Sequence, residues 1–177
     1  QQASSSATTG SQELSRVLMR FPISDITADR TANKIPANGS VSFYLRLFDA
    51  KTSKTVPKNY KLVVQAISRS WEEGDGLDLE NYSDLTKNGS GSNWIRASKA
   101  AAWTSVGGDY HTAPTYTQYF TGGLGNLDVD FTTLVEQWIA GSKSNYGVAL
   151  KQNSYYNNSL DCRVKGLFEK IVESSQC

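Results

Sequence analysis

The chain has 177 residues, enough for one domain that buries its own hydrophobic core without metal or disulfide support. Its 18 Lys and Arg residues against 17 Asp and Glu residues give a formal net charge of +1, and the two signs are interleaved. This balance argues against a dedicated nucleic-acid binder and against a polybasic membrane patch. No apolar run approaches the roughly 18 residues of a membrane span. From the charge balance and this absence together, we expect neither nucleic acid nor membrane as a partner.

The polar residues are mostly uncharged, with many Ser, Thr, Asn, Gly and Tyr, which favours an all-β protein. Residues 1–12 lack periodicity and are predicted to form a polar arm or linker. Segments 13–21, 41–48 and 60–68 alternate apolar and polar residues and are predicted to be strands, joined by short polar turns that favour antiparallel pairing. Their inward faces are Val17, Met19 and Phe21, then Val41, Phe43, Leu45 and Leu47, then Tyr60, Leu62, Val64 and Ala66.

The stretch from Trp71 to Gly123 is rich in Gly, Ser and Asn and shows only a weak pattern. We expect a long loop that is either functional or held down by its own aromatic side chains. The single histidine of the chain, His111, is expected to be exposed in this loop. Without a second histidine, the usual multi-histidine zinc sites lack ligands.

Regular patterns return after this loop. Segment 127–131 alternates as a strand, a short amphipathic helix is predicted at about 133–140, and 145–151 is predicted to be another strand. Thr133 and Glu136 have the spacing of a capping box, and Gly141 is placed to end the helix. We therefore expect one β domain over residues 13–160, followed at 161–177 by a C-terminal strand or tail.

The acidic stretch ISRSWEEGDGLDLENYSD, residues 67–84, has three possible uses. It can bind calcium, because an acidic Gly-rich loop supplies oxygen ligands, although the spacing is not that of an EF-hand. It can supply the two carboxylates of a glycosidase, or it can turn a corner over a buried Trp71. The candidate calcium ligands are Asp75, Asp78, Glu80 and Asp84, and the candidate catalytic acids are Glu72, Glu73 and Asp75.

Two other groups of side chains are candidates for binding or bonding. Exposed aromatic rings can stack on sugars, but aromatic residues also cover cores beneath long loops. The glycan-binding candidates are Trp94, Trp103, Tyr110, Tyr155 and Tyr156. Cys162 and Cys177 either form a disulfide or remain free thiols, and no neighbouring ligands suggest a metal site.

Several separated segments occur in the order of one known family. They are SRVLMRFPISDI, VSFYLRLFDA, SWEEGDG, a Trp followed by GGDY, and LDVDFTTLVEQWIAGSKSNYGVALK. Together they resemble the DNRLRE-type β-sandwich domain of secreted and surface-displayed proteins, over about residues 15–151. The most specific parts are the Arg20-Phe21 strand, the segment 70–74, and the region of Trp138 and 145–147.

Within that family the chain most resembles versions in structural proteins of tailed bacteriophages. The resemblance implies an antiparallel, jelly-roll-like β-sandwich and a non-enzymatic virion protein, a capsid decoration, fibre or collar component that contacts other virion proteins or copies of itself. It also implies that Trp71 caps the core at a structural corner. No cofactor is expected, apart from the possible calcium.

Related cellular modules imply an alternative, a carbohydrate-binding module of a secreted or surface-displayed protein that recognises cell-surface polysaccharide. The chain departs from the family pattern in two places: only a polar stretch precedes the 15–21 strand, and the chain closes with GLFEKIVESSQC. We therefore expect altered sheet edges, and an open edge can pair with a strand of a neighbouring chain.

Overall fold

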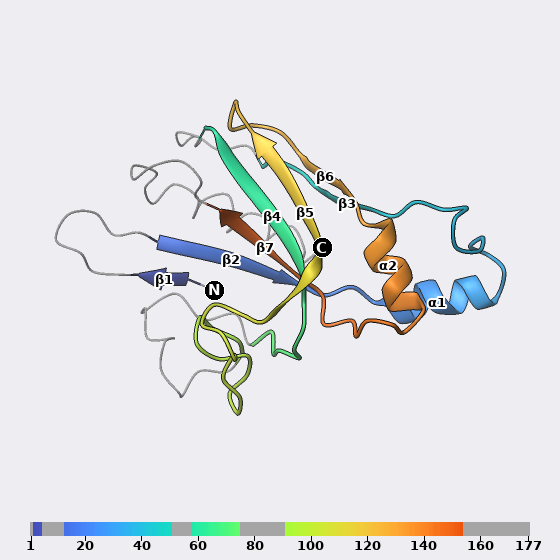
Figure 1. Cartoon of the computed structure of the whole chain (residues 1–177), viewed down its shortest axis with the longest axis horizontal. Helices are drawn as coiled ribbons and strands as arrows, with labels where there is room; N and C mark the ends of the chain where they lie inside the picture. The colour runs from blue at the N-terminus through green and yellow to red at the C-terminus, as the bar shows by residue number, and fades with distance from the viewer. Residues whose placement is uncertain (1, 5–12, 51–57, 75–90, 154–177) are drawn as a thin grey trace.

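The computed structural model describes residues 2–4, 13–50, 58–74 and 91–153 (Figure 1). The chain is mostly β, as predicted. Its elements are β1 (Gln2–Ser4), β2 (Glu13–Met19), α1 (Ile23–Thr31), β3 (Tyr44–Leu47), β4 (Tyr60–Ile67), β5 (Tyr110–Phe120), β6 (Leu127–Asp130), α2 (Thr132–Ile139) and β7 (Val148–Asn153).

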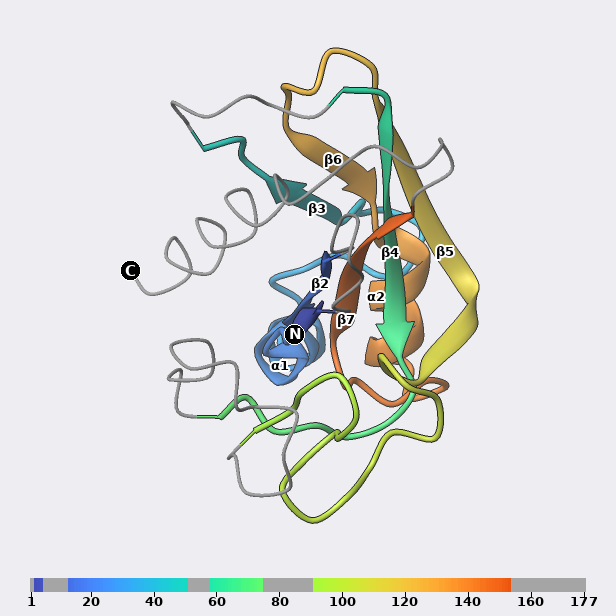
Figure 2. The ribbon, with the colours of Figure 1, turned by 90° about the vertical axis from the view of Figure 1, so that its left-hand side faces the viewer.

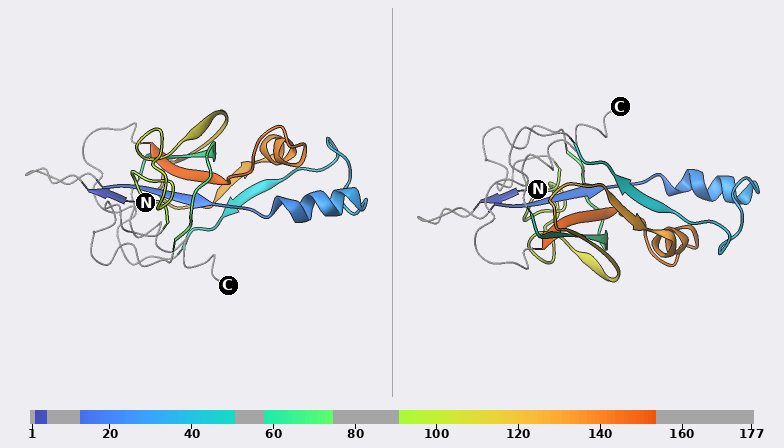
Figure 3. Two further views of the ribbon diagram at one scale, coloured as in Figure 1. Left: turned by 90° about the horizontal axis from the view of Figure 1, so that it is seen from below. Right: turned by 90° about the horizontal axis from the view of Figure 1, so that it is seen from above.

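Seven antiparallel strands form two sheets among the described residues. One sheet has five strands in the order β1-β2-β7-β4-β5, and the other pairs β3 with β6. Strand β7 lies at the centre of the larger sheet, where Leu150 is opposite Val17 of β2 and Val64 of β4. The short strand β1 lies within the residues expected to form a polar arm. Seen from above and below, β1 and the two helices lie at opposite ends of the molecule (Figure 3).

The main core lies on one face of the five-stranded sheet. Alternation places Leu62, Val64 and Leu150 on this face, where β3, β6 and α2 cover them (Figure 2). The covering side chains include Leu45 and Leu134, and Leu134 is fully buried. The inward residues predicted for the strand at 60–68 are thus confirmed as core residues, and the alternation at 127–131 places Leu127, Val129 and Phe131 against the same core.

A smaller core lies on the other face of the same sheet. It consists of Ile67, Trp71, Ala97, Trp103 and Ala149, all buried. The odd-numbered residues of β4 and β7 reach this face because side chains alternate along a strand. The segment 91–109 packs over it at the ends of β4 and β5 (Figure 2).

The prediction of a single helix is wrong, because α1 is a second one. Only Ile23 of α1 is buried, so the helix has almost none of the apolar periodicity that reveals a helix in a sequence. It is held instead by a two-pronged ion pair from the Arg30 guanidinium to the Glu136 carboxylate of α2. Neither described helix is long and apolar enough to cross a bilayer.

Helix α2 begins and ends within about one residue of the predicted range, but its predicted capping box is wrong. No side chain of the N-cap residue bonds the first turn. The Thr132 N–H donates to Asp130 Oδ1 at 2.8 Å, and Glu136 is occupied by Arg30. Gly141 follows the helix with a φ of 69°, which confirms its predicted role at the end of the helix.

Strand β5 lies inside the stretch that was predicted to be a loop, so that prediction is wrong there. Its alternation is hidden, because Thr residues occupy much of the outer face and Pro114 interrupts the pattern. His111 accordingly lies in a strand and is partly buried rather than exposed in a loop.

The two sheets are joined by one side chain of β5. The Gln118 amide nitrogen donates to the Asn126 carbonyl oxygen at 2.8 Å, and the Asp128 N–H donates to Gln118 Oε1 at 2.8 Å. The main-chain groups of β6 that face away from β3 therefore hydrogen-bond to an amide side chain rather than to the main chain of another strand.

Candidate functional site

Three segments that are distant in the sequence meet at Trp71. The Arg20 guanidinium carbon lies 4.9 Å from the centroid of the Trp71 ring, and Arg20 Nη2 donates to the Trp71 carbonyl oxygen at 2.7 Å. The Trp71 indole N–H donates to the Tyr146 carbonyl oxygen at 2.7 Å. Trp71 is 8% exposed and belongs to the smaller core, which confirms that it is a buried corner residue.

Residues 145–147 complete this arrangement. Asn145 Nδ2 donates to the Phe21 carbonyl oxygen at 2.8 Å, and the Phe21 ring packs on Trp138 with 6.4 Å between centroids. Gly147 has a φ of 80°, and a Cβ there would collide with the Met19 carbonyl oxygen. We call this set the motif junction: Arg20, Phe21, Trp71, Trp138 and residues 145–147.

The acidic side chain next to the corner is used for local structure. The Glu72 N–H donates to the Ala97 carbonyl oxygen at 2.9 Å, and Glu72 Oε2 accepts the Lys99 N–H at 3.0 Å. Gly74 has a φ of 90°, a conformation that favours glycine, so it turns the chain just after Trp71. These contacts explain Glu72 and Gly74 without a catalytic role.

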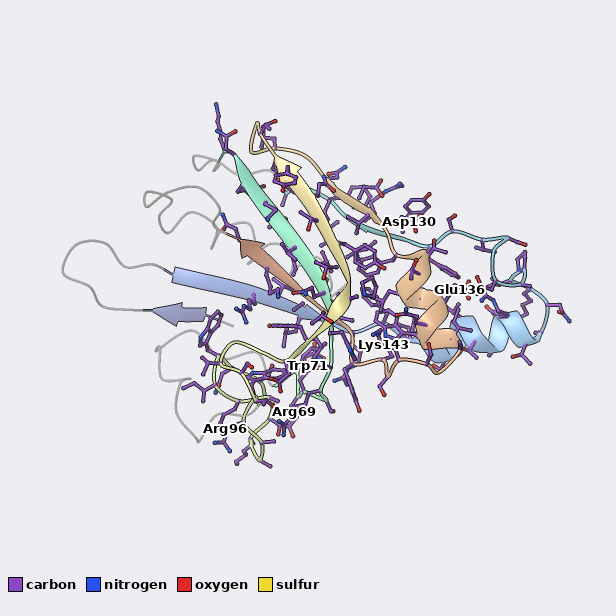
Figure 4. The ribbon with its side chains drawn as sticks, in the orientation of Figure 1. Arg69, Trp71, Arg96, Asp130, Glu136 and Lys143 are labelled. Carbon is purple, nitrogen blue, oxygen red and sulfur yellow. The ribbon has the colours of Figure 1, made fainter. Side chains whose placement is uncertain are left out.

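An open groove lies beside this corner, at the ends of β4 and β5. It has a volume of about 740 Å³, and most of the residues that line it have polar side chains. Figure 4 labels Arg69 on the same end of the molecule as Trp71, away from Glu136 and α2. The lining residues are Gln65, Ser68, Arg69, Thr104, Ser105, Gly108, Asp109, Tyr110, His111 and Thr112.

Asp109 is the fixed anion of the groove. Its carboxylate accepts the N–H groups of Thr104 at 2.9 Å and Ser105 at 2.8 Å, and it lies 3.8 Å from Arg69 Nη1. Burial alone would raise the pKa of Asp109, but these hydrogen bonds and the Arg69 charge outweigh it, so the pKa lies below its usual value. Asp109 is therefore a charged hydrogen-bond acceptor and a poor proton donor at neutral pH.

The pKa values of Tyr110 and His111, which also line the groove, are shifted toward their neutral forms. Burial raises the pKa of Tyr110 to about 12, although the Arg16 charge acts in the opposite direction. The pKa of His111 is lowered, first by burial and then by the positive charge of Lys143. Asp109 is the one carboxylate among the described lining residues, whereas glycoside hydrolysis uses a pair. The groove can offer hydrogen bonds to a polar ligand, and it shows no acid/base pair.

A row of cations and aromatic rings continues from the groove across the outer face of the sheet. The Arg16 guanidinium carbon lies 4.4 Å from the centroid of the Trp94 ring and 5.5 Å from that of Tyr110. Lys151 Nζ lies 3.9 Å from the Tyr110 centroid and donates to Gln65. Burial, and then the neighbouring Arg16, lower the pKa of Lys151 to about 8.

The structure brings three of the five glycan-binding candidates to this region. Trp94 and Tyr110 are partly exposed, each with a cation beside its ring. Trp103 is 6% exposed, and its indole N–H donates to the Asn93 carbonyl oxygen at 2.8 Å, so it belongs to the smaller core. Their role in glycan binding stays a prediction.

The remaining candidates lie outside the described residues. They are the glycan candidates Tyr155 and Tyr156, the calcium candidates Asp75, Asp78, Glu80 and Asp84, and the cysteines Cys162 and Cys177. Within the described ranges no group of three His, Cys, Asp or Glu side chains is arranged to hold a metal ion.

Sequence reasoning missed Arg69, Asp109 and Gln65 as residues of a shared groove. The pairing of β4 with β5 brings them together, since Gln65 is opposite Thr115 and Ile67 is opposite Tyr110. The sequence offered no clear signal for this pairing, because Thr residues and Pro114 hide the alternation of β5. In comparisons with known proteins, no family model, no curated protein and no solved structure matches this chain.

Proposed function

We propose that this chain is a non-enzymatic structural component of a virion, such as a capsid decoration, fibre or collar protein, that acts through protein–protein contacts. We further propose that its fold is a β-sandwich of jelly-roll character. In this arrangement the five-stranded sheet is one layer, and the β3–β6 pair belongs to the other. The shared core between these two sheets supports the proposal.

The observation that carries the proposal is the motif junction. The segments that resemble the phage versions of the DNRLRE-type domain are used there for packing and for hydrogen bonds to one another, as in the bond from Trp71 to Tyr146 and that from Asn145 to Phe21. Residues used in this way stabilise a fold and are not free to act on a substrate. This use of the residues fits a stable structural module that contacts neighbouring proteins through its surface.

Quantitative proteomics across a density gradient of particles from the source material tests this proposal. A virion component should peak with the major capsid protein at a fixed copy ratio. If the chain stays in the soluble or cell-wall fraction, the proposal is wrong.

The groove supports a second candidate, a carbohydrate-binding module of a secreted or surface-displayed protein. Arg69 and Asp109 offer a charged donor and a charged acceptor 3.8 Å apart, and sugar hydroxyls bind such pairs. The partly exposed rings of Trp94 and Tyr110 lie alongside. Retention on immobilised polysaccharides, measured with and without calcium, tests this candidate. Replacing Trp94 or Arg69 with Ala should abolish retention, whereas Ala at the exposed Leu124, away from the groove, should leave it unchanged.

A further inference from the structure

Among the described residues, the outer edge of β3 has no paired strand, and its side chains form a regular pattern. Tyr44 is 58% exposed and Phe48 is 70% exposed, and Arg46 lies between them. Tyr44, Arg46 and Phe48 share one face because side chains alternate along a strand, while Leu45 of the same strand is buried in the main core.

Hydrogen bonding shows which main-chain groups of β3 point outward. The Phe131 N–H donates to the Phe43 carbonyl oxygen at 2.7 Å, so these two residues form a hydrogen-bonded pair. Such pairs alternate along an antiparallel ladder, so Leu45 and Leu47 also bond to β6. The N–H and C=O groups of Tyr44 and Arg46 therefore face away from β6. Among the described residues, no other strand pairs with β3.

In the described part of the chain, β3 lacks the protection that the edges of β5 and β6 show. Edge strands are usually blocked by proline, by uncompensated charge or by a covering group. Strand β5 contains Pro114, and Gln118 covers the edge of β6. The one charged residue of β3, Arg46, is neutralised by Asp128, with 2.7 Å between Arg46 Nη2 and Asp128 Oδ2.

We propose that β3 is a dimerisation edge, at which two copies of this chain pair their β3 strands antiparallel about a two-fold axis at Arg46. The partner is a second copy of this chain because the edge has the sequence aromatic–x–Arg–x–aromatic. A two-fold axis at Arg46 brings each aromatic residue opposite an aromatic residue of the other copy. Tyr44 lies opposite Phe48 of the partner subunit on both sides of the axis, and aromatic cross-strand pairs are favourable. The two Arg46 side chains approach each other, each already paired with its own Asp128.

This inference rests on the proposed function, since it names one of the protein–protein contacts of the virion component. It is also separable from it. A chain that is monomeric in solution but peaks with the capsid refutes the dimer alone. A chain that dimerises through β3 but never accompanies particles refutes the virion role alone.

Sedimentation equilibrium of the purified full chain over a concentration series tests the dimer. The wild type should show a monomer–dimer equilibrium, and Tyr44→Lys should raise the dissociation constant at least tenfold, because it removes the aromatic cross-strand pair with Phe48 of the partner subunit and adds positive charge beside the two Arg46 side chains. Tyr119→Lys is the matched control, since Tyr119 is 68% exposed on β5. It should leave the constant within twofold of the wild type. A monomeric wild type, or equal effects of the two substitutions, overturns the proposal.

Cross-linking provides a second test that does not depend on affinity. In a background with Cys162→Ser and Cys177→Ser, the variant Arg46→Cys places two thiols opposite each other, at Cα atoms about 5.5 Å apart. That separation is within the range of a disulfide. Mild oxidation should yield covalent dimers of Arg46→Cys much faster than of Thr117→Cys on β5. Equal rates would contradict pairing at β3.

Discussion

Replacing Trp71 with Phe tests whether the motif junction holds the fold together. The substitution keeps an aromatic ring under Arg20 but removes the indole N–H that donates to the Tyr146 carbonyl oxygen. Leaving a buried polar group without its partner costs about 1–3 kcal/mol. The space left by the smaller ring adds about 1 kcal/mol. We therefore expect the free energy of unfolding to fall by about 2–4 kcal/mol.

Guanidinium unfolding at 25 °C, followed by far-UV circular dichroism, measures this loss independently of tryptophan fluorescence. Trp94→Phe is the control, because the described contact of Trp94 is with the Arg16 guanidinium, and a phenyl ring preserves such a contact. It should cost less than about 0.5 kcal/mol, as expected for a partly exposed site away from buried bonds. If Trp71→Phe costs no more than Trp94→Phe, the junction is not what stabilises this corner.

Three further predictions follow from single residues. Gly147→Ala should abolish folding or lower the melting temperature far more than Gly141→Ala, because both glycines have positive φ but only Gly147 faces a main-chain atom, the Met19 oxygen. For Lys151, the folded pKa of about 8 lies below the usual 10.5, so between these values the unfolded chain binds more protons and stability rises with pH. The stability of the wild type relative to Lys151→Met should therefore increase from pH 8 to pH 10, and a flat difference would contradict the lowered pKa. The pKa of Asp109 is lowered, so its contribution is present at neutral pH and is lost as pH falls through the folded pKa. The stability gap between wild type and Asp109→Asn, measured by thermal unfolding, should accordingly shrink in acid.

The sequence predicted the elements that bury one face in the main core. Period-two alternation identified β4 and β6, and a short apolar stripe identified α2, because Leu134 and Trp138 lie on one face of that helix. These signals are local, and burial imposes them directly on the sequence. Trp71 was also predicted to be a buried corner residue, but the residues left this as one of three alternatives and the choice among them came from the resemblance.

The parts that sequence reasoning missed depend on distant partners. Helix α1 carries little apolar periodicity, and the ion pair between Arg30 and Glu136 spans 106 residues. Strand β5 places Gln118 toward β6, where it forms hydrogen bonds. The inner face of this strand therefore lacks a continuous apolar pattern in the sequence. The groove exists only once β4 and β5 are paired, and no spacing in the sequence encodes that Arg69 and Asp109 meet.

The central position of β7 has a consequence for the order of folding. Strands β2 and β4 never pair with each other, and both bond to β7, which is the last described strand of the chain. During synthesis, the interior of the larger sheet therefore cannot form until residues 148–153 have left the ribosome. Until then β2 can pair only with β1 and β4 only with β5, so each pair keeps one open edge in a nascent polypeptide, and such edges are prone to associate with other chains. A truncation that removes β7 should therefore leave two separate, aggregation-prone fragments of sheet in place of a smaller folded domain.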